Sequence, residues 1–188
     1  MEEPILVVEE RNRAMGAATK AEIIRFGKFH RIVRVFIVRP AGEGRWELLL
    51  QQRAKTPADN GGKFDQSVGG HVNAADESDA GAAIREVADE LGLKIPLREL
   101  TKIGDFYIER PSGAGRLRRF QRVYVWISPQ PDLVVNFDAA EVELVRWREL
   151  NEIAGDVQVH PECYTTYFPK SVHMAQAWLS DYDGARTP

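Results

Sequence analysis

Three acidic side chains lie close together in the sequence, at a spacing that a helix would bring onto one face. They are Glu86, Asp89 and Glu90, and the 3.6-residue period of an α-helix places residues three and four positions apart beside each other. Like charges at this spacing repel, so such a helix needs either solvent or a cation next to them. Carboxylate oxygens are the ligands that hard divalent ions such as Mg²⁺ or Mn²⁺ prefer. The spacing therefore leaves two interpretations open, a solvated acidic face or a metal site.

The sequence predicts a helix around these acids, from about Ser78 to Leu91. Ser78 is a suitable N-cap residue, because its hydroxyl oxygen can accept a hydrogen bond from the first turn. Gly92 is suitable for the position just after the last turn. The apolar residues that we expect on the face opposite the acids are Ala80, Ile84, Val87 and Leu91.

The residues around this helix resemble the signature of the Nudix hydrolases, which reads G, five residues, E, seven residues and R-E-U-x-E-E-x-G-U, with U aliphatic. The second half is present as Glu77, seven residues and REVADELGL from Arg85 onward, with Asp89 replacing one glutamate. Six residues instead of five separate Gly70 from Glu77. Either the loop carries an extra residue or Asp76 shares the role of the acid. A motif with this many specified positions is far more specific than a single glycine-rich loop.

Four further segments resemble one branch of this superfamily, which is related to isopentenyl-diphosphate isomerase and contains many hydrolases. They are KFHRIVRVFI, ELLLQQRA, GGKFDQSVGGHV and EVELVRWREL. By this resemblance the isomerase's cysteine corresponds to Gly69, and its metal-binding histidines correspond to His71 and His30. Its acidic metal ligands correspond to positions 120–122, where this sequence has Phe, Gln and Arg. The isomerase metal site is therefore incomplete in this chain.

The resemblance implies roles for individual residues around the helix. Glu86, Asp89 and Glu90 would bind Mg²⁺ or Mn²⁺. Glu86 would also act as the general base, and Arg85 would orient it. Gly70, together with Gly69, would let the backbone approach the phosphates closely, since glycine has no side chain.

Basic residues near this loop are candidates for binding the substrate. Arg53 resembles the arginine of the branch's QQR segment, and an Arg or Lys can hold a diphosphate through charge-assisted hydrogen bonds. Lys63 and His71 are further candidates for contact with the substrate. A charged, solvated loop is the alternative for Lys63.

These residues predict a divalent-metal-dependent pyrophosphohydrolase. A diphosphate repels an attacking hydroxide, so a metal must neutralise its oxygens and lower the pKa of the attacking water. The expected substrate is a small-molecule diphosphate, either a nucleoside diphosphate derivative or an organic diphosphate.

Two alternatives stay open, an isopentenyl-diphosphate isomerase and a weakly catalytic Nudix domain that binds a nucleotide and regulates a partner. Isomerisation needs an acid and a base on opposite sides of the alkene, and Gly69 supplies neither. The single cysteine, Cys163, lies about ninety residues further on, and we expect it to be a buried, unreactive residue.

Length and composition limit the class of protein. A chain of 188 residues fits a single domain, and we predict a Nudix domain over residues 1–188 with an N-terminal strand and helix extension over 1–30. The net charge of -3 does not indicate a protein that binds a nucleic-acid polymer, since such proteins are usually basic. No apolar run is long enough to predict a membrane span. The single cysteine and the acidic first residues favour the cytoplasm. Formation of a homodimer stays open as an alternative to a monomer.

The expected fold class is α/β (α+β), a Nudix-type α/β/α sandwich with a mixed β-sheet. Helices are expected at 19–27, 78–91, from 150 onward and at 171–182. A loop is expected over 54–63, and Tyr124 and Trp126 are expected in the core. Strands are expected at 5–8, 31–39, 46–52, 64–68, 103–109, 117–128 and 143–148.

Overall fold

The computed structural model describes residues 3–55 and 60–184. Its helices are α1 Lys20–Phe26, α2 Asp79–Leu91, α3 Leu150–Val159 and α4 Phe168–Gly184, with short 3₁₀ turns at Leu97–Glu99 and Pro161–Cys163. Its strands are β1 Ile5–Val8, β2 Ala14–Ala18, β3 Phe29–Pro40, β4 Trp46–Arg53, β5 Phe64–Asp65, β6 Val68–His71, β7 Thr101–Ser112, β8 Gly115–Ile127 and β9 Val142–Glu149. None of the helices in these ranges is long and apolar enough to cross a membrane.

Strand β3 is the centre of a mixed sheet that includes all the described strands. One side of β3 pairs antiparallel with β1, β6 and β4 in turn along its length. The other side pairs parallel with β8, from Phe29 opposite Arg118 to Val38 opposite Ile127. β7 forms a long hairpin with β8, and β9 pairs with β4. The sheet therefore combines parallel and antiparallel neighbours, as expected.

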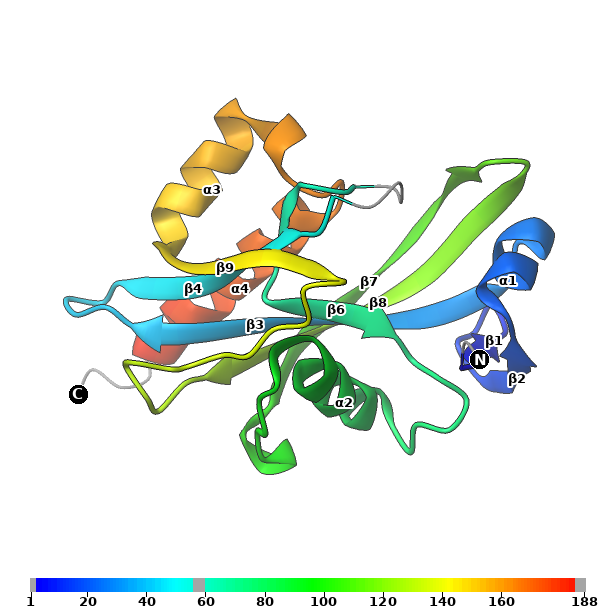
Figure 1. Ribbon diagram of the computed structural model, residues 1–188, viewed down its shortest axis with the longest axis horizontal. Coiled ribbons are helices and arrows are strands. Elements are labelled where there is room, and N and C mark those ends of the chain that lie inside the picture. Colours follow the sequence, from blue (N-terminus) through cyan, green and yellow to red (C-terminus); the bar gives the residue numbers. More distant parts are fainter. Residues whose placement is uncertain (1–2, 56–59, 185–188) are drawn as a thin grey trace.

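Helices cover both faces of this sheet, which confirms the α/β/α sandwich (Figure 1). Successive residues of a strand point to opposite faces, so Val35 packs in the core beneath α2 while Phe36 packs in the core beneath α3 and α4. The predicted core positions Tyr124 and Trp126 are both buried on the α2 side. Each face therefore has its own apolar core, and the long strands are shared between them.

Helix α2 begins and ends where the sequence predicts. The Ser78 hydroxyl accepts a hydrogen bond from the backbone N–H of Gly81 at 3.0 Å, and Gly92 ends the helix in the left-handed region with φ of 65°. The predicted division of its faces was partly wrong. Val87 is fully buried, but Ile84 is only partly buried, and the acidic residue Glu90 is buried with the apolar ones.

Two local predictions differ from the structure, and one falls partly outside the described residues. Strand β2, with the sequence AMGAA, was not predicted, because it has no β-branched residue and its first four residues are exposed. The strand expected over 64–68 is divided into β5 and β6. The buried Ser67 lies between them, and its hydroxyl accepts a hydrogen bond from the backbone N–H of Ile37 at 2.8 Å. In the expected loop at 54–63, Pro57 and Asp59 lie outside the described residues.

Candidate active site

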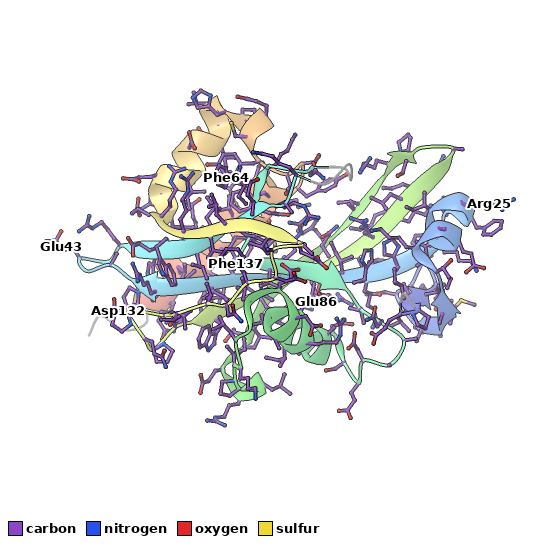
Figure 2. All side chains as sticks on the ribbon, in the orientation of Figure 1. Arg25, Glu43, Phe64, Glu86, Asp132 and Phe137 are labelled. Atoms are coloured by element: carbon purple, nitrogen blue, oxygen red, sulfur yellow. The ribbon has the colours of Figure 1, made fainter. Side chains whose placement is uncertain are left out.

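A cleft of about 640 Å³ lies against the second half of α2 and the end of β6. Glu86 projects from α2 toward the strands (Figure 2). The other walls come from β3, β4, the β7–β8 hairpin and the segment 165–167. Of the predicted site residues, the cleft brings together Arg53, Gly69, Gly70, His71, Arg85, Glu86, Asp89 and Glu90.

The acids of α2 differ in their surroundings. Glu90 is only 5% exposed, and the Gln51 side chain donates a hydrogen bond to its Oε2 at 2.6 Å. Burial, together with the charges of Glu86 and Glu141 and against the hydrogen bond from Gln51, raises the pKa of Glu90 to about 8. Burial also raises the pKa of Glu86, against the lowering effect of Arg85. The Asp89 side chain is 62% exposed and lies at the margin of the cleft.

Arg85 fixes the orientation of Glu86, as the sequence analysis expected. Its Nη1 donates to Glu86 Oε1 at 3.0 Å, and its Nη2 donates to the His71 carbonyl at 2.9 Å. Its Nε and Nη2 each donate to a different oxygen of Asp76 at 3.0 Å. These hydrogen bonds to Asp76 are the main reason why the pKa of Arg85 is raised. The guanidinium therefore links the loop before α2 to the acid that α2 presents.

Asp76, rather than Glu77, is the acid of the loop that binds Arg85. Glu77 is exposed, whereas Asp76 also accepts a hydrogen bond from the backbone N–H of Asn73 at 2.7 Å. Five residues separate Gly70 from Asp76, so the spacing of the first half of the motif is kept. Of the two alternatives left open by the sequence, the structure supports a shared role for Asp76.

The two glycines of β6 lie where a side chain would collide with the site. A Cβ built on Gly70 would lie 2.0 Å from the carboxyl carbon of Glu86, and one built on Gly69 would lie 2.5 Å from Nε2 of Gln66. Gln66 is itself only 2% exposed and has little freedom to move. Gly70 thus allows Glu86 to lie against the backbone, and a cysteine at position 69 would need Gln66 to shift.

Basic side chains form the wall that faces α2. Arg53 lines this wall, as predicted, whereas Lys63 is not among the residues that line the cleft. Three further arginines that the sequence analysis did not identify as site residues also line it: Arg34, Arg110 and Arg119. The signal for Arg34 was present, since a charged residue interrupts the apolar run of β3 and is buried there. We call Arg34, Arg53, Arg110 and Arg119 the basic cluster.

The two predicted histidines lie together, with a cation beside them. The His30 and His71 rings stack with centroids 5.5 Å apart, and Arg119 Nε donates to His30 Nε2 at 3.1 Å. Because Nε2 accepts, Nδ1 of His30 carries the proton and faces the Lys28 carbonyl. Burial, then the Arg119 charge, lowers the pKa of His30 to about 4, and the same causes lower that of His71. Both rings are therefore neutral at pH 7, and Nε2 of His30 already serves as the acceptor for Arg119.

Cys163 does not return to the cleft. It lies in the 3₁₀ turn Pro161–Cys163, is exposed, and has its sulfur 3.9 Å from Glu162. The expectation that it would be buried was wrong, because this turn lies on the surface. Cys163 does not line the cleft formed by the described residues, so it supplies no thiol to replace the one missing at Gly69.

The donor chemistry of the α2 side fits a divalent ion. In the described ranges no three His, Cys, Asp or Glu side chains already converge as metal ligands do. However, Glu86 and Glu90 share one wall of the cleft with Asp138 and Glu141. Glu86 and Glu141 both act against the ionisation of Glu90, so a cation would relieve their repulsion. Carboxylates in this arrangement are suitable ligands for Mg²⁺ or Mn²⁺.

Comparison with known proteins assigns the chain to a class. The NUDIX domain family matches residues 28–167, and the chain therefore belongs to the Nudix family. Its curated relatives include isopentenyl-diphosphate Delta-isomerase 2 of Photorhabdus laumondii, which is 26% identical over 92% of both chains. Isopentenyl-diphosphate Delta-isomerase 2 of Aromatoleum aromaticum is 28% identical over 88% of this chain and 82% of that one. The resemblance to the isomerase-like branch is thereby confirmed.

Solved structures support the same fold. The DR0079 protein of Deinococcus radiodurans is 21% identical, with a TM-score of 0.70 over 91% of this chain and 98% of that one. The Ap4A hydrolase of C. elegans is 18% identical, with a TM-score of 0.57 over 81% of this chain and 98% of that one. These likenesses establish the fold. The reaction has to be inferred from the residues of the cleft.

Proposed function

We propose that this protein is a divalent-metal-dependent Nudix pyrophosphohydrolase, which cleaves a diphosphate linkage by attack of water. The observation that carries the proposal is the contact between Gly70 and Glu86. The missing side chain at Gly70 lets the Glu86 carboxylate lie against the backbone of β6, and Arg85 holds it there through its hydrogen bonds to Glu86 and Asp76. An oriented carboxylate in a polar cleft is suited to hydrolysis of a charged anhydride.

Different residues of the cleft would have different roles in this reaction. Glu86 and Glu90, with Asp89 at the margin, would hold Mg²⁺ or Mn²⁺, which supplies charge neutralisation and a lowered pKa for bound water. Glu86 would accept the proton of the attacking water, since burial raises its pKa toward the working pH. Arg53 would bind the phosphates. The substrate would be a small nucleoside diphosphate derivative or organic diphosphate in the cytoplasm, with no nucleic-acid polymer or membrane involved.

Isomerisation of isopentenyl diphosphate is the second candidate, because the curated relatives reported above carry that name. Three features of the cleft argue against it. Gly69 has no thiol, and a side chain there would require Gln66 to shift. Cys163 lies on the surface, and Arg119 donates a hydrogen bond to His30 of the stacked histidine pair. We therefore place hydrolysis first.

One experiment separates the two candidates. Purified protein is incubated with Mg²⁺ and a panel of nucleotide sugars, dinucleotides, nucleoside triphosphates and prenyl diphosphates, and the products are followed by ³¹P and ¹H NMR. We expect new phosphate monoester signals that disappear with a chelator and in Glu86→Gln. Formation of dimethylallyl diphosphate from isopentenyl diphosphate, without hydrolysis of any other compound, would instead establish the isomerase.

A further inference from the structure

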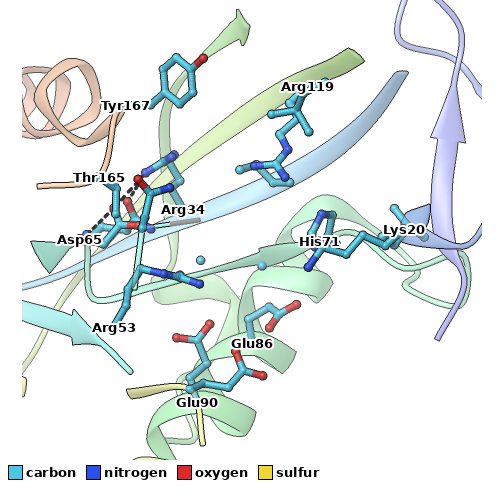
Figure 3. Close-up of a pocket in the computed structure, with 18 of the residues that line it drawn as sticks. Lys20, Arg34, Arg53, Asp65, His71, Glu86, Glu90, Arg119, Thr165 and Tyr167 are labelled. Atoms are coloured by element: carbon cyan, nitrogen blue, oxygen red, sulfur yellow. Dashed lines mark hydrogen bonds and ion pairs between the residues drawn. The ribbon is translucent and has the colours of Figure 1, made fainter. Parts of the chain in front are cut away.

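The cleft has two walls of opposite charge. The acids of α2 and of the segment before β9 line one side, and the basic cluster lines the other. Figure 3 places Glu86 and Glu90 on one side of the opening and Arg119 and Tyr167 on the other. On the proposed function the divalent ion would bind at the acidic wall, and Arg53 of the basic cluster would contact the scissile diphosphate. The proposed reaction gives no role to most of the basic wall.

Two arginines of the basic cluster differ in the partners that surround them. Arg34 is paired, because its Nη1 contacts Asp65 at 3.2 Å and its Nε donates to Gln121 at 2.9 Å. Arg119 has a different environment. Its Nε donates to the neutral His30, and in the described part of the chain it forms no ion pair with a carboxylate. Charges without a partner are costly to bury, so a guanidinium in this position calls for an anion.

A polar group without a partner lies on the same wall. Thr165 is 4% exposed, and its hydroxyl oxygen has no hydrogen-bond partner among the described residues. It lines the cleft beside Tyr167. Buried hydroxyl groups are normally hydrogen-bonded, and a ligand oxygen in the cleft would provide the missing partner. Thr165 and Arg119 thus point independently to an anionic or strongly polar ligand group on this wall.

The mutual influence of the arginines shows that they share one region. The Arg119 pKa is lowered to about 10, mainly by burial and then by the charges of Arg34, Arg110 and Arg53. The Arg34 pKa is lowered by burial as well, and Arg53 adds to that effect. A hydrocarbon chain would gain little from such a surface, whereas a phosphate or carboxylate would relieve the repulsion among the cations.

We propose that Arg119 forms a second anion subsite, in the cleft that Thr165 also lines, which selects diphosphate substrates that carry a further phosphate or carboxylate group remote from the scissile linkage. This inference deepens the proposed function and rests on it for the identity of the reaction. Arg119 would bind the remote anion through charge-assisted hydrogen bonds, and Thr165 would donate its hydroxyl proton to another polar group of the same ligand. The cleft volume of about 640 Å³ is adequate for a nucleotide-sized ligand of this kind.

The first test measures binding without hydrolysis. Calorimetry in EDTA compares pairs of compounds that differ by one remote anion: coenzyme A with dephospho-coenzyme A, NADP with NAD, and UDP-glucuronate with UDP-glucose. We expect the more anionic member of at least one pair to bind roughly 10- to 100-fold more tightly. If the more anionic compound binds more tightly only in the first two pairs, the subsite binds a phosphate. If it does so only in the third pair, the subsite binds a carboxylate. A ratio near unity in every pair would overturn the proposal.

The second test uses variants on neighbouring positions of β8. Arg119→Gln should abolish the preference within a pair while the less anionic member binds as before. Arg118→Gln is the matched control, because Arg118 pairs with Glu109 and does not line the cleft. If Arg119→Gln weakens both members equally, Arg119 holds the diphosphate itself and the subsite does not exist.

Two further variants keep the proposal open to refutation if Arg119→Gln fails to fold. Thr165→Val removes an unpaired hydroxyl, so it should leave the melting temperature unchanged or raised and weaken the binding of both members of a pair. Arg119→Lys should keep part of the preference for the more anionic member. Unchanged affinities in Thr165→Val, together with an unchanged preference in Arg119→Lys, would contradict the geometry proposed. Hydrolysis is measured separately with Mg²⁺. Selective binding without hydrolysis would refute only the proposed reaction. Hydrolysis without selective binding would refute only the subsite.

Discussion

Glu90 allows a quantitative prediction for the metal-free protein. Its pKa in the fold is raised from the ordinary value of 4.5 to about 8, mainly by burial. Between these two pH values the folded protein therefore keeps a proton that the unfolded chain releases. The folded state binds more protons, so its stability falls as the pH rises through this window. Glu90→Gln removes the titrating group and keeps a hydrogen-bonding side chain beside Gln51.

The size of the effect follows from the same numbers. Where the folded and unfolded states differ by one bound proton, each pH unit changes the free energy of unfolding by about 1.4 kcal/mol. About two pH units of the range between the two pKa values lie above pH 6. From pH 6 to pH 9 wild type should therefore lose about 3 kcal/mol of unfolding free energy relative to Glu90→Gln. The difference between the two proteins cancels the titration of groups that are distant from Glu90.

The assay is urea unfolding in EDTA at pH 6 and pH 9, followed by far-UV circular dichroism. Added Mg²⁺ at pH 9 should raise the wild-type midpoint more than that of Glu90→Gln, because an ion bound only to the folded state stabilises it. A pH dependence equal in the two proteins, within about 0.5 kcal/mol, would show that Glu90 is not held in the environment described.

Four other outcomes are expected on the proposed function. Glu86→Gln should lower kcat by roughly 10²- to 10⁴-fold at saturating Mg²⁺, and unchanged turnover in a folded variant would remove Glu86 from the reaction. Gly70→Ala should displace the Glu86 carboxylate and cost roughly 100-fold in kcat/KM, with calorimetric melting to check that the fold survives. Arg53→Ala should raise KM by about tenfold and leave kcat within about twofold; a lower melting temperature with normal kinetics would make Arg53 structural instead. Cys163→Ser should change neither hydrolysis nor melting, and any isomerase activity lost in that variant would contradict the position of Cys163 on the surface.

Features that depend on local sequence could be predicted, and they include most of the secondary structure. The helix expected at 19–27 is α1, and both hydrogen bonds of a capping box between Thr19 and Glu22 are present at its start. Helix α2 and the strands β3 and β4 were also located correctly. In each case a few adjacent residues determine the local energy, so the sequence alone was informative.

Features that depend on long-range contacts could not be predicted in the same way. The partner of Arg85 was ambiguous between Asp76 and Glu77, because only the path of the loop decides which carboxylate faces the guanidinium. Glu90 is polar by type and was expected on the acidic face, yet the packing of β4 against α2 buries it beside Gln51. Arg34, Arg110 and Arg119 of the basic cluster were missed for a similar reason, since they come from separate strands and have no common spacing.

The pairing of β3 with β8 has a consequence for how this protein folds. The contacts around Arg85 join residues only 9 and 14 positions apart, so the part of the acidic wall that α2 contributes lies within one short segment. The contact between His30 and Arg119 spans 89 positions. Closing a longer loop costs more entropy, and parallel pairing over such distances forms slowly. During refolding, amide protons of α2 should therefore gain protection before those of β8, and the ability to bind a cation should return earlier than the ability to choose a substrate.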